Sequence, residues 1–184
     1  MYVVSVVILV VWAAFWLYWL AASVGVKAGR NRWTRFAGVR VAIVFLVILL
    51  LRLGVFRGNG HAVTGSPLLQ GIGLALFVLG LALAVWARLF LGRNWGMPMT
   101  QKADPELVTN GPYRTIRHPI YTGILLAMVG TAIAVSLYWL VAVVVLGAYF
   151  VYSAIVEERY MAERFPDSYP GYKRSTRMLI PLIL

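Results

Sequence analysis

Apolar residues gather in five long runs along the chain, and the stretches between the runs hold most of the charged residues. The runs cover residues 3–26, 39–55, 68–91, 120–135 and 137–155. A helix needs about 20 apolar residues to cross the hydrocarbon core of a bilayer, so each run predicts a transmembrane helix. We therefore expect an all-α integral membrane protein, a bundle of five transmembrane helices in one domain over residues 1–184.

The last two runs are almost continuous, and together they are too long for one span of about 20 residues. A small polar residue, Ser136, follows Val135 at the point where the two runs meet. This step predicts a tight helical hairpin with Ser136 at its tip.

The stretch after the fifth run mixes charged residues with aromatic ones and turns apolar again at residues 178–184. Such a pattern predicts an amphipathic segment that lies along the membrane surface. Pro166, Pro170 and Gly171 are expected to interrupt it.

The basic residues predict the orientation of the bundle. All but two of the 17 Lys and Arg residues lie in or beside the connections after the first, third and fifth runs; Arg52 and Arg57 are the exceptions. Because basic residues collect on the cytoplasmic side, we expect the N-terminus outside and the C-terminus in the cytoplasm, in the plasma membrane of a prokaryote. All six acidic residues fall on the same inner side, where a water-soluble cofactor would meet the protein.

Composition agrees with a bilayer protein and argues against other classes. Hydrophobic residues make up 61% of the chain and charged residues only 12%. The net charge of +11 comes from separate basic blocks and forms no continuous stripe, so we expect no nucleic-acid partner. Cysteine is absent, and His61 and His118 are predicted on opposite sides of the membrane, so we expect no disulfide and no metal site.

Residues 107–123, which lead into the fourth run, form the most informative motif. Asn110, Gly111 and Pro112 predict a turn, and Pro119 is suited to the first turn of a helix. Residues 117–118 are thereby placed at the positive end of that helix, which favours a bound carboxylate.

One interpretation of Arg114 and Arg117 is that they are ordinary basic residues flanking a membrane span. The motif, however, also supplies the aromatic rings of Tyr113 and Tyr121, and the imidazole of His118, at one membrane entry. Donors, aromatic faces and a glycine turn in one place are more than charge anchoring requires, and they indicate a ligand site.

Two adjacent acids, Glu157 and Glu158, are expected at the end of the fifth helix, where the helix dipole disfavours negative charge. One interpretation is structural: Arg114, Arg117 or Arg159 compensates the charge. The other is functional: a carboxylate binds the ribose hydroxyls or the ammonium group of a ligand. Both interpretations can hold, with one Glu in each role.

Several short motifs occur in a fixed order over the second half of the chain. They are Leu91-Gly92-Arg93-Asn94-Trp95, Gly111-Pro112-Tyr113, the stretch from Arg117 to Gly123, Glu157-Glu158, and the tail residues Phe165, Tyr169, Tyr172, Arg177 and Pro181. In these motifs and their spacing, residues 107–181 resemble the isoprenylcysteine carboxyl methyltransferase family and the related membrane phospholipid methyltransferases.

The apolar runs predict three N-terminal helices in residues 1–91, and the resemblance implies a cofactor-binding, catalytic half in residues 92–184. It implies S-adenosyl-L-methionine as cofactor and a lipophilic or prenylated acceptor that enters from the membrane lipid. Arg117 corresponds to a residue that the family uses near the reacting carboxylate, and is the candidate catalytic residue. The implied cofactor contacts are Leu107, Val108, Gly111, Tyr113, His118, Tyr121, Glu157 and Glu158.

No Rossmann domain is expected. The one G-x-G, at Gly71 and Gly73, lies inside an apolar run without a preceding strand, and it predicts packing between helices instead.

Two other functions stay open. A membrane reductase of the sterol-reductase type, which would use NADPH, carries a similar Arg-His-Pro-x-Tyr element and acidic-aromatic tail. A non-enzymatic protein that binds lipid is the second. The acceptor is open as well: an isoprenylcysteine carboxylate needs no base, whereas with an amine or thiol acceptor His118 or a glutamate would have to remove a proton.

Overall fold

The structure is a computed structural model, and it describes residues 2–22, 29–30, 66–96, 101–102 and 104–179. The predicted run at 39–55 lies outside these residues. The described elements are α1 (Tyr2–Ala21), β1 (Gly29–Arg30), α3 (Pro67–Leu91), η1 (Gly92–Asn94), β2 (Gln101–Lys102), η2 (Gly111–Arg114), α4 (Pro119–Ala134), α5 (Trp139–Arg164) and α6 (Tyr169–Ser175). The two short strands pair antiparallel and join the segments that follow α1 and η1.

The all-α integral membrane fold is confirmed. α1, α3 and α5 are long and apolar enough to cross a membrane, and α4 is a shorter apolar helix of 16 residues. Residues 135–138 connect α4 to α5, so the predicted hairpin is confirmed and Ser136 lies in its turn. The predicted first run ended at residue 26, but α1 ends at Ala21 and residues 23–26 lie outside the described part.

The predicted end of the fifth helix is wrong. α5 continues to Arg164, past the expected end at residue 155, because the residues that follow are mostly good helix formers. The helix ends just before Phe165, whose φ of −127° fits the restriction that Pro166 places on the residue before it. Glu157 and Glu158 therefore lie about two turns inside the helix, and the helix dipole no longer explains their need for a partner.

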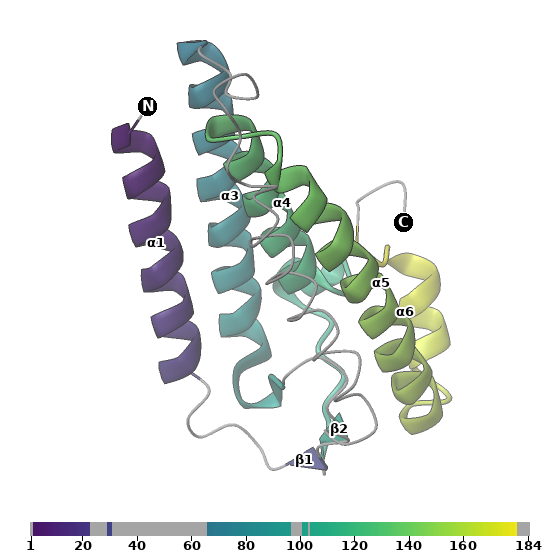
Figure 1. Cartoon of the computed structure of the whole chain (residues 1–184). Helices are drawn as coiled ribbons and strands as arrows, with labels where there is room; N and C mark the ends of the chain where they lie inside the picture. Colours follow the sequence, from purple (N-terminus) through teal and green to yellow (C-terminus); the bar gives the residue numbers. More distant parts are fainter. Residues whose placement is uncertain (1, 23–28, 31–65, 97–100, 103, 180–184) are drawn as a thin grey trace.

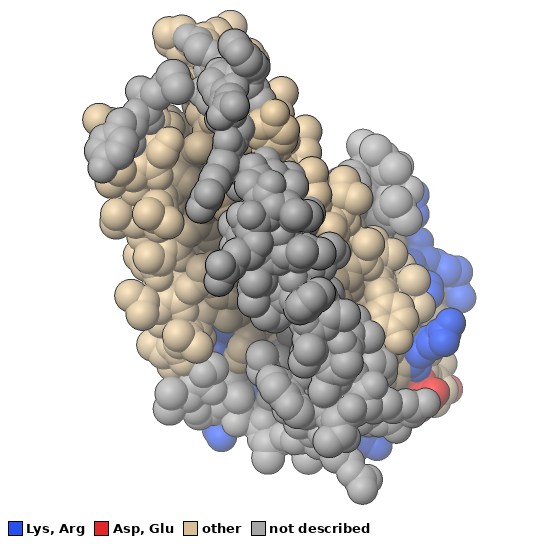
Figure 2. Space-filling model, in the orientation of Figure 1, with Lys and Arg blue, Asp and Glu red and all other residues tan. Residues whose placement is uncertain are grey.

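The helices place the charged residues of the described segments at one end of the bundle. The C-terminal ends of α1, α3 and α5, the start of α4, α6 and the two strands lie in the lower half of Figure 1. The described parts of the helices carry no Lys, Arg, Asp or Glu in residues 2–22, 66–87 and 120–156. On the face shown in Figure 2, the blue and red atoms lie toward the bottom and along the right side, and the described residues at the upper left are tan. We call the lower end the charged end.

α3 and α4 pack with their backbones in close contact. Glycines seven residues apart face each other across the two helices: Gly73 and Gly80 on α3, and Gly123 and Gly130 on α4. A Cβ atom on Gly80 would lie only 2.4 Å from the backbone nitrogen of Ala127. Small residues let membrane helices approach in this way. The predicted packing role is confirmed for Gly73, whereas a Cβ on Gly71 would meet nothing within 4 Å.

The side chain of Trp12 on α1 forms a polar contact with α4 in an apolar region of the bundle. The indole nitrogen of Trp12 donates a hydrogen bond to Thr131 Oγ1 over 3.1 Å, and that hydroxyl donates to the carbonyl oxygen of Ala127 over 2.9 Å. The Trp12 ring also packs edge-on against Phe77, with 5.7 Å between ring centroids.

Replacing Thr131 by valine is expected to lower the free energy of unfolding by about 0.6–1.7 kcal/mol, the range measured for hydrogen bonds between membrane helices. The change keeps the shape of the side chain and removes the acceptor of the Trp12 indole. A double-mutant cycle with Trp12→Phe, followed by unfolding in detergent, measures the coupling. Strictly additive effects of the two changes would contradict this assignment.

Candidate functional site

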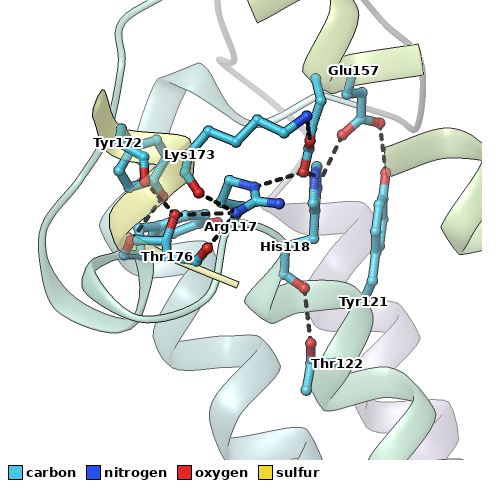
Figure 3. Close-up of polar contacts among 10 residues, drawn as sticks. Arg117, His118, Tyr121, Thr122, Glu157, Tyr172, Lys173 and Thr176 are labelled. Atoms are coloured by element: carbon cyan, nitrogen blue, oxygen red, sulfur yellow. Dashed lines mark hydrogen bonds and ion pairs between the residues drawn. The ribbon is translucent and has the colours of Figure 1, made fainter. Parts of the chain in front are cut away.

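The residues that the sequence singled out come together at the charged end, where α4 begins and α5 passes. His118 is the N-cap of α4 and Pro119 occupies its first turn, as predicted. Figure 3 shows the side chains of Arg117, His118 and Tyr121 turned toward the last turns of α5. We call these three residues, with Glu157 and Glu158, the site cluster.

Arg117 and Glu158 form a buried ion pair. Arg117 Nε donates to Glu158 Oε1 over 2.6 Å, and the two side chains are 8% and 3% exposed. Arg117 Nη1 also donates to the carbonyl oxygens of Thr176, at 2.5 Å, and Lys173, at 3.2 Å. Of the three arginines expected to compensate the acids, Arg117 is the one that pairs with Glu158, and it also holds α6 against α5.

Lys173 of α6 supplies a second cation to the same carboxylate. Its Nζ lies 2.8 Å from Glu158 Oε2, although the Lys173 side chain is 53% exposed. No sequence motif selects Lys173, because its pairing with a residue on α5 depends on how α6 folds back (Figure 3).

Glu157 and His118 form the other half of the cluster. Tyr121 donates its hydroxyl hydrogen to Glu157 Oε1 over 2.6 Å. His118 Nδ1 lies 3.5 Å from Glu157 Oε2, and His118 Nε2 lies 3.6 Å from Glu158 Oε1. The imidazole is therefore placed between two carboxylates, and its Nε2 is buried without a hydrogen-bond partner.

Two rings of the site cluster and the neighbouring ring of Phe150 lie parallel to one another. The His118 and Tyr121 rings are 5.5 Å apart with an interplanar angle of 4°, and the Tyr121 and Phe150 rings are 4.5 Å apart with an angle of 5°. The Tyr121 side chain thus extends along α5 from Phe150 to Glu157, and stacking fixes its ring beside the carboxylate.

The segment after α6 fixes the start of α4 through its backbone. Arg177 and Met178 accept hydrogen bonds from the amides of Arg117 and His118, at 2.8 and 3.0 Å. In return the Arg177 amide donates to Thr115, in a short parallel bridge. Thr122 adds a bond from its hydroxyl to the carbonyl oxygen of Leu179, at 2.6 Å. These contacts join residues about 60 positions apart, and no periodicity in the sequence indicates them.

The other predicted cofactor contacts lie on η2 and the segment before it. Tyr113 is buried, and its carbonyl oxygen accepts a 2.7 Å hydrogen bond from the Tyr172 hydroxyl. Burial raises the pKa of the Tyr172 hydroxyl to about 12, so this donor keeps its proton at neutral pH. Gly111 has a φ of 57°, a conformation that favours glycine. Val108 packs against the buried core.

Leu107, Val108 and Gly111 make no described hydrogen bond to the site cluster. The structure therefore joins five of the nine predicted site residues directly, and places the remaining four on the neighbouring segment.

Comparison with known proteins shows the family. The model of the phospholipid methyltransferase family matches residues 69–168, which include α3, η2, α4 and α5. The chain belongs to this family.

Named relatives and a solved structure agree with that membership. The chain is 33% identical to the cobalt-zinc-cadmium resistance protein CzcN of Cupriavidus metallidurans over 78% of its own length. It is 30% identical to the protein-S-isoprenylcysteine O-methyltransferase of Schizosaccharomyces pombe over 62% of its length. A solved eukaryotic isoprenylcysteine carboxyl methyltransferase matches 84% of the chain with a TM-score of 0.60 and 24% identity, which shows a shared fold.

The resemblance seen in the sequence is thus confirmed for the family. The chain spans 62% of the length of the first relative, 50% of the second and 55% of the solved chain. The match therefore covers between 50% and 62% of each of these proteins.

Proposed function

We propose that the protein is an S-adenosyl-L-methionine-dependent membrane methyltransferase that acts on a lipophilic acceptor at the cytoplasmic face. The reaction proposed is carboxyl O-methylation of an isoprenylcysteine-like acceptor. The observation that carries the proposal is the site cluster itself, in which a stacked imidazole and phenol lie beside two carboxylates at the charged end. Membership of the family and the named isoprenylcysteine methyltransferase relatives support the same chemistry.

The chemistry of the cluster fits the groups of this cofactor. Glu157 is 27% exposed, and an ionised carboxylate has about four lone-pair sites, so beside its contacts with Tyr121 and His118 it can also accept hydrogen bonds from ribose hydroxyls or an ammonium group. His118 Nε2 lies 3.6 Å from Glu158 Oε1 without a described hydrogen bond, and it offers a further polar contact. The ring of Tyr113 would favour a cationic sulfonium, whereas the Tyr121 ring is stacked against His118 and Phe150 and would act through its hydroxyl bond to Glu157. The backbone at Leu107, Val108 and Gly111 would hold the remainder.

When bound, the cofactor supplies an activated methyl group. A carboxylate acceptor is ionised at neutral pH, so the protein need only hold the acceptor in line and exclude water, which makes proximity and orientation the main contributions to rate. Among the bonds of the described residues, Arg117 Nε and Nη1 hold Glu158 and α6. Arg117 thus positions Glu158, and its predicted contact with the acceptor stays a prediction.

The orientation of the chain is part of the proposal. The charged end faces the cytoplasm, with the N-terminus outside and the C-terminus inside, because basic residues collect on that side of membranes.

The proposal is tested by calorimetric titration of the detergent-purified protein with S-adenosylhomocysteine and, separately, with NADPH. Saturable binding of S-adenosylhomocysteine alone is expected. Binding of NADPH alone would favour the reductase, and folded protein that binds neither would favour a lipid-binding protein without enzymatic activity.

Replacing Glu157 by glutamine is expected to weaken S-adenosylhomocysteine binding about tenfold or more, because a hydrogen bond to a charged group contributes about 1.5–3 kcal/mol. Glu163→Gln is the matched control, since Glu163 is an exposed glutamate on the same helix. Titration calorimetry of both variants measures the difference. Equal affinities in the two variants would remove Glu157 from the cofactor site.

A further inference from the structure

α6 and the residue after it pack one face against the charged end. Tyr169 and Thr176 are 3% and 4% exposed, and Tyr172, between them, donates its hydroxyl hydrogen to the carbonyl oxygen of Tyr113. Spacings of three and four residues place these side chains on one side of a helix. The segment is therefore amphipathic, and its other side faces away from the bundle.

The outer side of this segment is basic. Lys173, Arg174 and Arg177 are exposed, and residues 168–179 contain no Asp or Glu. On the face shown in Figure 2, blue atoms extend along the right side, where Figure 1 places α6. We call these three residues the tail cations.

Two of the tail cations lack a partner among the described residues. Lys173 Nζ lies 2.8 Å from Glu158 Oε2. The side chains of Arg174 and Arg177 form no ion pair or hydrogen bond within the described segments, which include all six acidic residues of the chain. Like charges on one short segment repel each other, so an external anion would stabilise this arrangement.

The backbone pairing sets the depth of the tail cations relative to a membrane. Met178, next to Arg177, accepts a 3.0 Å hydrogen bond from the amide of His118, the N-cap of α4. α4 begins at Pro119, and residues 120–156 carry no charged side chain. Arg177 therefore lies at the level where the apolar part of the bundle ends, and lipid head groups begin at that level.

We infer that the outer side of α6, with Arg177, binds the phosphate groups of anionic lipids in the leaflet at the charged end. Basic side chains beside a membrane span are attracted to an anionic lipid surface. A guanidinium matches phosphate oxygens with two parallel hydrogen bonds, and its apolar stem can lie along the bilayer. The depth of Arg177 favours a lipid surface over an acidic protein in the aqueous phase.

Lipid bound at this surface would hold α6 on the site cluster. α6 supplies Lys173 to Glu158, and the carbonyl oxygens of Lys173 and Thr176 accept hydrogen bonds from Arg117. Detachment of α6 would remove these contacts together. The anionic lipid content of the membrane thus controls how much of the protein has a complete cluster. An effect of this lipid on cofactor affinity rests on the proposed function.

The test measures amide hydrogen exchange of the unaltered protein in two kinds of nanodisc. One contains phosphatidylcholine alone, and the other an equal mixture of phosphatidylcholine and phosphatidylglycerol. Exchange in residues 115–118 and 172–179 reports detachment of α6, because these amides include the donors that join the two segments. The anionic lipid is expected to slow this exchange about tenfold, and high salt to remove the difference.

Residues 92–95, which include η1, are the internal control at the same end of the bundle. Their exchange is expected to be the same in both nanodiscs. Equal rates at α6 in the two nanodiscs would overturn the inference, and so would an equal slowing at α6 and η1, because that would be a general effect of the lipid on the bundle.

Substitution then assigns the lipid effect to the tail cations. Arg177→Gln is expected to remove part of the effect, and Arg174→Gln/Arg177→Gln nearly all of it, with exchange in phosphatidylcholine unchanged. Arg93→Gln removes the same charge from an exposed position on η1 and is expected to leave the effect as it was. A purely structural role would change exchange in both nanodiscs equally. An unchanged lipid effect in the double variant would overturn the inference.

Soluble anions distinguish a lipid surface from other partners. Inorganic phosphate and polyglutamate are added separately to the protein in phosphatidylcholine nanodiscs. Protection of α6 by either one, without protection by phosphatidylglycerol, would assign the surface to free phosphate or to an acidic protein and overturn the inference. The exchange measurement needs no cofactor. A protein that binds no S-adenosylhomocysteine but is protected by the anionic lipid would therefore fail the proposed function and keep the lipid-binding surface.

Discussion

Replacing Glu158 by glutamine is expected to lower the free energy of unfolding by about 3–5 kcal/mol, because it leaves a buried guanidinium without its partner. Arg117 and Glu158 are both almost fully buried, and the 2.6 Å bond between them joins α4 to α5. Lys173 loses its carboxylate in the same step. Thermal or denaturant unfolding in detergent measures the change.

The matched comparison is the double variant Arg117→Met/Glu158→Leu. Replacing a buried ion pair with apolar groups of similar volume is often neutral or stabilising, so this variant is expected to regain most of the lost stability. It is not expected to regain S-adenosylhomocysteine binding, because His118 then lies beside one carboxylate instead of two. A single variant as stable as the unaltered protein would show that the ion pair contributes little.

The second large effect is expected from Gly80→Ala. The added Cβ would lie 2.4 Å from the Ala127 nitrogen and 2.5 Å from the Gly123 carbonyl oxygen, and backbone atoms cannot move aside as a flexible side chain can. α3 and α4 would have to separate, with an expected loss of about 3 kcal/mol, the upper part of the range for overpacking.

Gly71→Ala is the control on the same helix, because nothing lies within 4 Å of its added Cβ. It is expected to gain about 0.5–1 kcal/mol, since alanine favours a helix more than glycine does. Unfolding of both variants under the same detergent conditions measures the contrast. If the two alanines had equal effects, the close contact of α3 with α4 would not be a source of stability.

The sequence predicted the parts of the fold that depend on local pattern. The bounds of α3 and α4 are within one residue of the predicted runs, because apolar length and a proline at each start define them. α5 was predicted too short, since hydropathy falls at Glu157 while helix propensity does not. Apolar character predicts where a helix enters and leaves the membrane, and α5 continues beyond that point.

The site was predicted in part for a similar reason. His118, Tyr121 and Glu157 were recognised because their residue types carry chemistry at a membrane entry. Lys173 was not, because a basic residue near a span has the same appearance in sequence whether it anchors the helix or neutralises a buried group. Only its partner, Glu158, distinguishes it.

The backbone pairing at the start of α4 has a consequence for biosynthesis. Four hydrogen bonds between residues 177–179 and residues 115–122 hold this turn, and the ribosome makes residues 177–179 about 60 residues after residues 115–122. α4 and α5 are therefore synthesised, and can enter the membrane, before Arg117 and His118 receive their backbone partners. The helices can therefore be inserted before the site cluster is complete. Any chemistry at the site cluster begins only after translation has passed residue 179.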